Sequence, residues 1–166
     1  MGKVSKNIVL IGMPGCGKTT LGKIISKNLG LKFFDVDQCI EQWSGKLIPQ
    51  LFDVSEEHFR NVESEVVHEL SKENTSVIST GGGVIKKLIN IERLKETGII
   101  VFIDRPIENI ASDVEVSTRP LLKDGVHKLY ELFNERYEIY KKCCDFHVMN
   151  DSDLDQTVKK IIGIIN

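Results

Sequence analysis

The sequence predicts an α/β fold, in which helices cover both faces of a parallel β-sheet. Short, largely apolar segments alternate along the chain with longer segments whose apolar residues recur at helical spacing. Strands that are apolar on both faces are typical of a parallel sheet, because helices bury both of its sides. Five such segments predict a five-stranded sheet: residues 7–12, 31–37, 76–80, 98–104 and 145–150.

The segments between these strands supply the expected outer layers. Apolar residues at helical spacing predict helices over residues 18–29, 56–72 and 125–142. A last helix is expected near the carboxyl end of the chain, where Ser152 and Asp155 have the spacing of a capping box. Connections between parallel strands cross over the sheet, so these helices must cover its faces. The expected architecture is a three-layer sandwich of helix, sheet and helix.

Length and composition fit one domain over residues 1–166. The chain contains 41% hydrophobic and 28% charged residues, which is ordinary for a soluble protein. Its formal net charge of −2 at pH 7 provides no general attraction for nucleic acid, so no nucleic-acid partner is expected. The first apolar run is too short for a signal peptide, and no later run is long enough to span a membrane. We therefore expect no membrane partner.

The cysteine pattern favours reduced thiols. The four cysteines are Cys16, Cys39, Cys143 and Cys144. None has the C-x-x-C spacing typical of zinc ligands, and the adjacent Cys143 and Cys144 can pair only with distortion of the backbone. Reduced cysteines are typical of the cytoplasm, which is the expected location.

A glycine-rich motif follows the first predicted strand and opens the first predicted helix. The stretch "GMPGCGKT" at residues 12–19 fits G-x-x-x-x-G-K-[ST] in the strand–loop–helix setting that this motif requires. Its backbone N–H groups can point inward at phosphate oxygens, and the helix N-terminus adds a partial positive charge. Lys18 reaches the outer phosphates, and the Thr19 hydroxyl can bind magnesium. The motif predicts a site for a nucleoside triphosphate.

The neighbouring loop residues belong to the same predicted nucleotide site. They are Gly15, Cys16, Gly17 and Thr20. Cys16 stands where such a loop usually needs only a small side chain, so we interpret it as a space-filling residue whose amide contributes to phosphate binding.

The loop alone does not define the reaction. GTP-binding switches also carry a guanine-reading N-K-x-D motif, which the sequence lacks. Larger ATPase motors need a longer chain and an acid at a strand end, a position that Asp104 imitates. Small-molecule kinases of this length remain, and they need a second substrate site.

Two carboxylates follow the second predicted strand. Asp35 and Asp37 are two residues apart at the strand end that faces the ligand edge of a parallel sheet. If alternation points them in different directions, one can hold magnesium through water and the other can accept a hydrogen bond from a substrate hydroxyl. The alternative is that Asp37 caps the following helix.

Arginines and glycines elsewhere are compatible with an anion site. Arg60 lies three residues before Glu63, which either forms a surface ion pair or orients the guanidinium toward a bound anion. The consecutive glycines at 81–83 close a predicted strand and permit close approach of the backbone to a ligand. Arg136 borders the apolar stripe of its predicted helix and, taken alone, is interpreted as a solvated arginine.

The ordered set of motifs resembles the shikimate kinase family. The phosphate-binding loop is followed by "DVD", "IEQWSGKLIPQLF", "FRNVE", "STGGGV" and "TRPLL", and the resemblance covers roughly residues 7 to 165. It implies the nucleoside monophosphate kinase-like fold and a P-loop kinase with a short lid. It also implies transfer of the terminal phosphoryl group of magnesium-ATP to the 3-hydroxyl of shikimate. The implied partners are ATP, shikimate and Mg²⁺, and a monomer is expected.

Roles in catalysis and in magnesium binding follow from the resemblance. Lys18 matches the lysine of the phosphate-binding loop, and Thr19 matches the hydroxyl that binds magnesium. Asp35 matches the acid that holds magnesium through water. Asp37 matches the acid at the shikimate hydroxyls and is the candidate general base.

The remaining roles concern the substrate and the lid. Arg60 and Arg136 match the pair that grips the substrate carboxylate, and Gly82 lies in the glycine run that lines that site. Arg119 matches a lid arginine that closes over the phosphates and serves both catalysis and nucleotide binding. The lid is expected over residues 112–124, which lack a strong apolar period.

Two departures from the family pattern affect the nucleotide site. The acidic segment before Arg119 lacks the further arginine that lids of this family often carry, and "NDSDLDQ" lacks the basic residue that can flank adenine. Two alternatives stay open. One is a kinase for another small polyol acid such as gluconate, against which the "DVD", "FR" and "GGG" set argues. The other is a nucleotide-binding regulatory domain without turnover, which only the lid segment supports.

Overall fold

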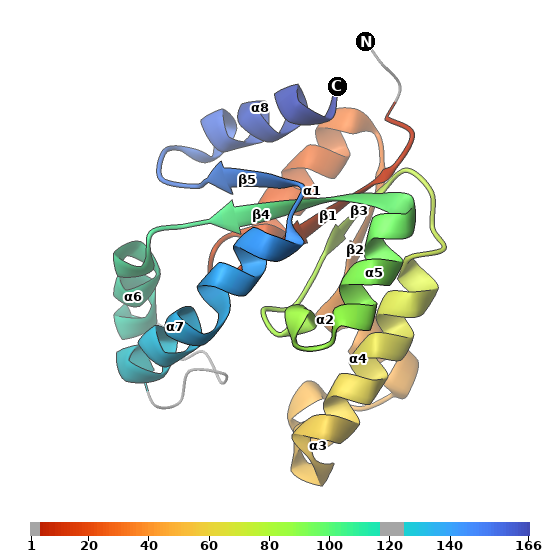
Figure 1. The fold of residues 1–166 in the computed structure, drawn as a ribbon, viewed down its shortest axis with the longest axis vertical. Helices are drawn as coiled ribbons and strands as arrows, with labels where there is room; N and C mark the ends of the chain where they lie inside the picture. The colour runs from red at the N-terminus through yellow and green to blue at the C-terminus, as the bar shows by residue number, and fades with distance from the viewer. Residues whose placement is uncertain (1–3, 117–124) are drawn as a thin grey trace.

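A five-stranded parallel sheet forms the centre of the computed structural model, which describes residues 4–116 and 125–166 (Figure 1). The strands are β1 (Asn7–Ile11), β2 (Lys32–Asp35), β3 (Ser76–Ser79), β4 (Gly98–Asp104) and β5 (Phe146–Met149). Their order in the sheet is β2-β3-β1-β4-β5, and every neighbouring pair is parallel. The predicted α/β fold with five parallel strands is confirmed.

Helices cover both faces of this sheet. The helices of the described residues are α1 (Lys18–Leu29), α2 (Val36–Ser44), α3 (Ile48–Val54), α4 (Glu56–Leu70), α5 (Leu88–Thr97), α6 (Ile107–Val116), α7 (Gly125–Cys143) and α8 (Leu154–Ile165), with a short 3₁₀ helix η1 (Val84–Lys86). Figure 1 shows α1 and α8 together on one face and α5 and α7 on the other. Within the described ranges, no helix has the length and apolar character needed to cross a membrane.

The core is built on the central strands. The side chains of residues 8–11 on β1 are completely buried, and those of β3 and most of β4 are buried beside them. Burial on both faces explains why these strands are apolar over nearly their whole length. The rigid sheet brings the carboxyl ends of β1, β2, β3 and β4 to one edge, where the predicted site residues follow.

The first turn after β1 requires glycine. Gly12 has a φ of 150°, and a Cβ atom there would lie 2.5 Å from the carbonyl oxygen of Ile103 and 2.8 Å from the sulfur of Cys16. Gly17 has a φ of 102° and leads directly into α1. These two positions let the chain curl tightly between β1 and α1, as the motif predicted.

The second strand is shorter than predicted. It ends at Asp35, whose carboxylate accepts hydrogen bonds from the N–H groups of Asp37 at 3.0 Å and Gln38 at 3.3 Å. This capping begins α2 at once, because it satisfies two N–H groups of the first helical turn. The alternation argument for Asp35 and Asp37 was wrong, because residues two apart on a strand point to the same face. In the structure Asp35 is the cap of α2, and Asp37 lies in the first turn of that helix.

The cap of the last helix and the predicted lid differ from the expectations or lie partly outside the described residues. The N-cap of α8 is Asp153, which accepts a hydrogen bond from the N–H of Gln156 at 2.8 Å, so the predicted capping box of Ser152 and Asp155 was wrong. Of the predicted lid, residues 112–116 form the end of α6, and Arg119 lies outside the described residues.

Candidate active site

The phosphate-binding loop forms a closed turn around the amine of Lys18. The Nζ atom donates hydrogen bonds to the carbonyl oxygens of Gly12 at 2.8 Å and Met13 at 2.9 Å, and Lys18 is 8% exposed. The side chain of Cys16 is completely buried, and its carbonyl oxygen accepts a hydrogen bond from Asn150 at 2.9 Å. These bonds hold the Lys18 amine at the centre of the loop.

A hydroxyl and a carboxylate meet beside this loop. The Thr19 hydroxyl donates a hydrogen bond to Asp35 Oδ2 at 2.9 Å and lies 3.5 Å from the hydroxyl of Ser79. Hard oxygen donors of this kind suit Mg²⁺, which commonly keeps several waters and needs only one or two protein carboxylates. Among the described residues, no group of three or more His, Cys, Asp or Glu side chains is placed to hold a metal ion.

Two cavities adjoin at the same edge of the sheet. The larger, of about 700 Å³, is lined by residues 14–20 of the loop and by residues that follow β3, β4 and β5. The smaller, of about 240 Å³, is lined by residues of α3, α4 and α7. Both share the same four residues: Pro14, Asp37, Gly81 and Gly82. A reaction between molecules in the two cavities would take place along this wall.

Asp37 is the titratable group of the shared wall. Burial raises the pKa of its carboxyl above the ordinary value, and the neighbouring Asp35 raises it further. Lys18 and Arg60 oppose this shift with smaller effects on the Asp37 pKa. A carboxylate with a raised pKa takes up a proton more readily than one in water, which suits a general base.

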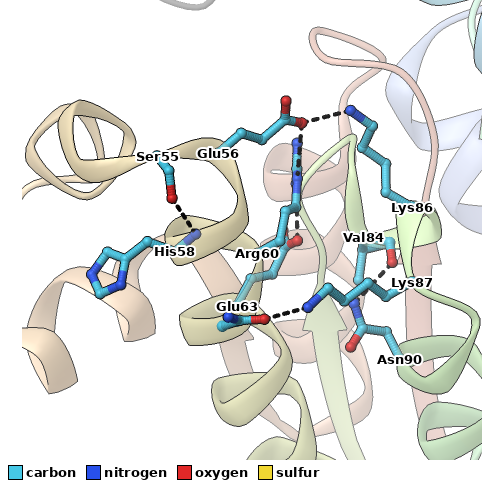
Figure 2. Close-up of polar contacts among 10 residues, drawn as sticks. Ser55, Glu56, His58, Arg60, Glu63, Val84, Lys86, Lys87 and Asn90 are labelled. Atoms are coloured by element: carbon cyan, nitrogen blue, oxygen red, sulfur yellow. Dashed lines mark hydrogen bonds and ion pairs between the residues drawn. The ribbon is translucent and has the colours of Figure 1, made fainter.

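The smaller cavity contains a guanidinium held by two acids. Arg60 donates a hydrogen bond to Glu63 at 2.9 Å, and its Nε atom forms an ion pair with Glu56 at 3.5 Å. Figure 2 shows Glu56 between Arg60 and Lys86, whose Nζ lies 2.5 Å from the same carboxylate. The Phe59 ring lies 5.0 Å from the guanidinium carbon. Arg60 is therefore fixed in place on α4.

Glu63 is almost fully buried beside this arginine. It is 1% exposed, and one of its two oxygens has no hydrogen-bond partner among the described residues. Burial raises the pKa of the Glu63 carboxyl, and Arg60 lowers it with a smaller effect. Of the two interpretations left open by the sequence, the geometry fits an orienting role for Glu63, because a surface ion pair would be solvated.

Arg136 brings a second guanidinium to the smaller cavity from α7. It is 6% exposed, and its Nε atom has no hydrogen-bond partner in the part of the chain that the structure describes. The interpretation of Arg136 as a solvated arginine, made from the helix pattern alone, was therefore wrong. A pair of partly desolvated guanidinium groups provides the charge and the N–H donors that recognise a carboxylate.

The three glycines after β3 make room for neighbouring side chains. A Cβ atom at Gly81 would lie 3.1 Å from a carboxylate oxygen of Asp37, and one at Gly82 would lie 2.8 Å from the ring of Pro14. At Gly83 it would lie 2.3 Å from the guanidinium of Arg60. Side chains of the site thus pack against this backbone, which also lines the smaller cavity, and the predicted approach of a ligand to it stays a prediction.

Comparison with known proteins places this arrangement in one family. The model of the shikimate kinase family matches residues 14–166. A shikimate kinase of Clostridium botulinum strain Eklund 17B is 53% identical over 98% of this chain and 98% of its own length. A shikimate kinase of Clostridium beijerinckii is 46% identical over 98% of this chain and 96% of its own. The chain belongs to the shikimate kinase family.

A solved structure agrees with this assignment. The shikimate kinase from Acinetobacter baumannii, in complex with shikimate, superposes with a TM-score of 0.90 at 33% identity. The match covers 98% of this chain and 94% of that one. The resemblance to the shikimate kinase family inferred from the sequence motifs is confirmed.

Sequence reasoning missed an arginine, Arg105, that lines the larger cavity. Arg105 follows β4 directly and donates hydrogen bonds to the carbonyl oxygen of Gly15 at 3.1 Å and to Asp113 at 2.5 Å. It lines the larger cavity together with Asn109 and Asp113. Its position immediately after a buried strand, at the ligand edge, is the signal that could have found it. Arg105 thus places a positive charge beside the phosphate-binding loop. The acidic segment before Arg119 contains no lysine or arginine that could supply one.

Asp104 lies outside the linings of both cavities. It is 5% exposed, and its Oδ2 atom accepts hydrogen bonds from the Tyr137 hydroxyl at 2.6 Å and from His147 at 2.7 Å. It is not among the described residues that line the two cavities. Its bonds join β4 to α7 and β5, so we interpret Asp104 as a structural acid.

The environments of Asp35 and Asp104 predict that only the substitution of Asp35 changes the magnesium dependence of activity strongly. In Asp35→Asn the Mg²⁺ concentration for half-maximal activity is expected to rise about tenfold to a hundredfold, the usual effect of losing a group that orients metal ligands. Asp104→Asn is expected to change it less than about twofold. Magnesium titrations of phosphoryl transfer, with thermal melts to check folding, measure both. The reverse ranking would show that Asp104 holds the metal.

Proposed function

We propose that this protein transfers the terminal phosphoryl group of magnesium-ATP to the 3-hydroxyl of shikimate. The observation that carries the proposal is the shared wall between the two cavities, with Asp37 on it and a cation on each side. Lys18 lies on the loop side, and Arg60 lies on the other. One cavity suits a polyphosphate and the other suits a small carboxylated molecule.

The chain's own groups account for binding. Loop N–H groups and the N-terminus of α1 bind the phosphates, and Lys18 exchanges its loop carbonyls for an outer phosphate oxygen. Thr19 and Asp35 would hold Mg²⁺, which neutralises phosphate charge when it is bound. The guanidinium groups of Arg60 and Arg136 bind the shikimate carboxylate and thereby fix the orientation of the ring.

Asp37 is the proposed general base of the reaction. Its carboxylate accepts a hydrogen bond from the attacking hydroxyl and takes the proton as the new oxygen–phosphorus bond forms. The raised pKa supports this role, because it brings the carboxylate closer to the acidity of a useful base. Arg119 is proposed, from the family resemblance, to contact the phosphates.

The pH dependence follows from the direction of this shift. The base must be ionised, so turnover is lost as pH falls through the pKa of Asp37, and the raised value places this loss above pH 3.8. Below that pKa we expect kcat/KM to fall about tenfold for each pH unit. A profile of kcat/KM against pH measures this acidic limb, and Asp37→Asn should remove it. A limb that persists unchanged in Asp37→Asn would assign the base elsewhere.

One assay tests the function itself. Purified protein is incubated with ATP and Mg²⁺ and given shikimate, gluconate or no acceptor, and ADP is measured. ADP release that depends on shikimate is expected. Release with gluconate instead would support another polyol-acid kinase, and absence of turnover with every acceptor would support a regulatory nucleotide-binding domain.

We also propose that the protein acts as a cytoplasmic monomer. All four cysteines, Cys16, Cys39, Cys143 and Cys144, are free thiols, as is typical of a reducing compartment. Light scattering after size-exclusion chromatography tests the oligomeric state.

A further inference from the structure

The substrate cavity is formed by segments that are distant in the chain, and a tyrosine joins two of them. Arg136 belongs to α7, whereas Gly82 belongs to the loop after β3. One helical turn beyond Arg136, Tyr140 is completely buried, and its hydroxyl donates a hydrogen bond to the Gly82 carbonyl oxygen at 2.6 Å. This bond directly links the helix that carries Arg136 to the glycine loop.

The same hydroxyl lies close to Arg136. Burial raises the pKa of Tyr140, and the nearby guanidinium of Arg136 opposes that shift with the largest lowering effect. Tyr140 therefore lies directly behind the cavity wall, between the predicted carboxylate-binding arginine and the glycine loop. It is not one of the described residues that line the cavity itself.

The position of the Tyr140 ring is set by the sheet. Phe102 of β4 is 1% exposed and stacks on the Tyr140 ring with centroids 5.2 Å apart and an angle of 26° between the planes. A ring held between a buried strand and its own helix has little freedom to move its hydroxyl. The oxygen is thus a fixed point to which the loop can be attached.

We propose that Tyr140 is a positioning residue for substrate binding, which fixes the glycine loop at Gly82 relative to the guanidinium of Arg136. The inference rests on the proposed function of the same cavity and adds a residue to it. With the hydroxyl removed, the carbonyl of Gly82 loses its buried partner, and the loop is free to shift against α7. The substrate then binds in a cavity in which the Gly82 loop and Arg136 of α7 no longer have a fixed relative position.

A second tyrosine on the same helix provides a matched control. Tyr137 packs against Phe102 with centroids 5.7 Å apart and donates its hydroxyl to Asp104 at 2.6 Å. Like Tyr140, it joins α7 to another segment by one short hydrogen bond. Its bond points to the end of β4 and away from both cavities. Removing either hydroxyl breaks one hydrogen bond of 2.6 Å, but only the bond of Tyr140 reaches a residue that lines the smaller cavity.

The test compares Tyr140→Phe with Tyr137→Phe in steady-state kinetics. For Tyr140→Phe we expect the KM for shikimate to rise about threefold to tenfold, the usual worth of one buried hydrogen bond. Its KM for ATP and its kcat should stay within about twofold of the wild-type values. Tyr137→Phe should leave all three constants within about twofold while lowering thermal stability.

The outcomes separate this inference from the proposed function. A wild-type protein that does not phosphorylate shikimate overturns the function. An active wild type with an unchanged shikimate KM in Tyr140→Phe, or with equal changes in both variants, overturns only the role of Tyr140. Equal changes in the KM values for shikimate and ATP also overturn it, because they indicate a general structural loss.

Fluorine NMR of the protein without substitutions tests the proposal even if Tyr140→Phe does not fold. The chain has three tyrosines, so 3-fluorotyrosine labelling gives three fluorine resonances. Tyr130→Phe and Tyr137→Phe assign two of them and leave the third to Tyr140. Shikimate alone should shift the Tyr140 resonance and leave that of Tyr137 nearly unchanged. A Tyr140 resonance that does not respond to saturating shikimate contradicts the proposal.

Discussion

Lys18→Ala is expected to remove nearly all turnover while the protein stays folded. Lys18 is the cation at the centre of the phosphate-binding loop, and its charge is delivered to the phosphoryl group as it transfers. Removing a preorganised group of this kind typically costs about a hundredfold to a thousandfold in kcat. The loop itself should survive, because its turns depend on Gly12 and Gly17 rather than on the lysine.

The control for this variant lies on the same helix. Lys23 is exposed on α1, outside the described residues that line the cavities, so Lys23→Ala should have wild-type kinetics. Circular dichroism and steady-state ADP release measure both variants. Near-normal turnover by folded Lys18→Ala would contradict the assignment of the loop to ATP.

Arg60→Ala and Arg136→Ala are expected to weaken shikimate binding strongly. Truncating one partner of a buried, hydrogen-bonded charge pair costs about 2–5 kcal/mol, which corresponds to roughly 30-fold to several thousand-fold in affinity. The KM for ATP should change much less, because both guanidinium groups lie on the smaller cavity. Lysine at either position should restore binding only in part, because an ammonium cannot form a two-pronged contact.

Two controls make the result specific to the carboxylate. Arg93 lies on α5 outside this cavity, so Arg93→Ala should leave the shikimate KM unchanged. A shikimate analogue without its carboxylate should bind the wild type poorly and lose little more in the two variants. If the analogue suffers the full loss in Arg60→Ala and Arg136→Ala, the arginines act on another part of the substrate.

The parts of the fold that depend on local chemistry could be predicted. The phosphate-binding loop has fixed residues at fixed spacing, and its glycines at 12 and 17 are needed for the backbone conformations observed. The central strands are apolar because both faces are buried, so their sequence shows them directly. The strand that ends at Asp35 was placed less well, because its carboxylate starts a helix by capping, an effect that competes with strand periodicity.

The parts that depend on packing between distant segments could not be predicted from residues alone. Arg136 stands on a helix whose apolar stripe was visible, but its burial follows from how α7 packs on the rest of the chain. Arg105 meets the carbonyl of Gly15, which is ninety positions away in the chain. The helix α5 was not predicted, because its polar residues leave only a short apolar pattern around Ile91 and Leu94. For Arg136, only the family resemblance anticipated a place in the site.

The common boundary of the two cavities has a consequence for ligand design. Because Pro14, Asp37, Gly81 and Gly82 line both spaces, the two cavities meet at these residues, and a molecule in one lies next to a molecule in the other. A bisubstrate compound that joins a carboxylated ring to a polyphosphate would therefore need only a short tether passing Asp37. Since the second half would bind at a high effective concentration, such a compound could exceed the affinity of either half by about 10²–10⁴.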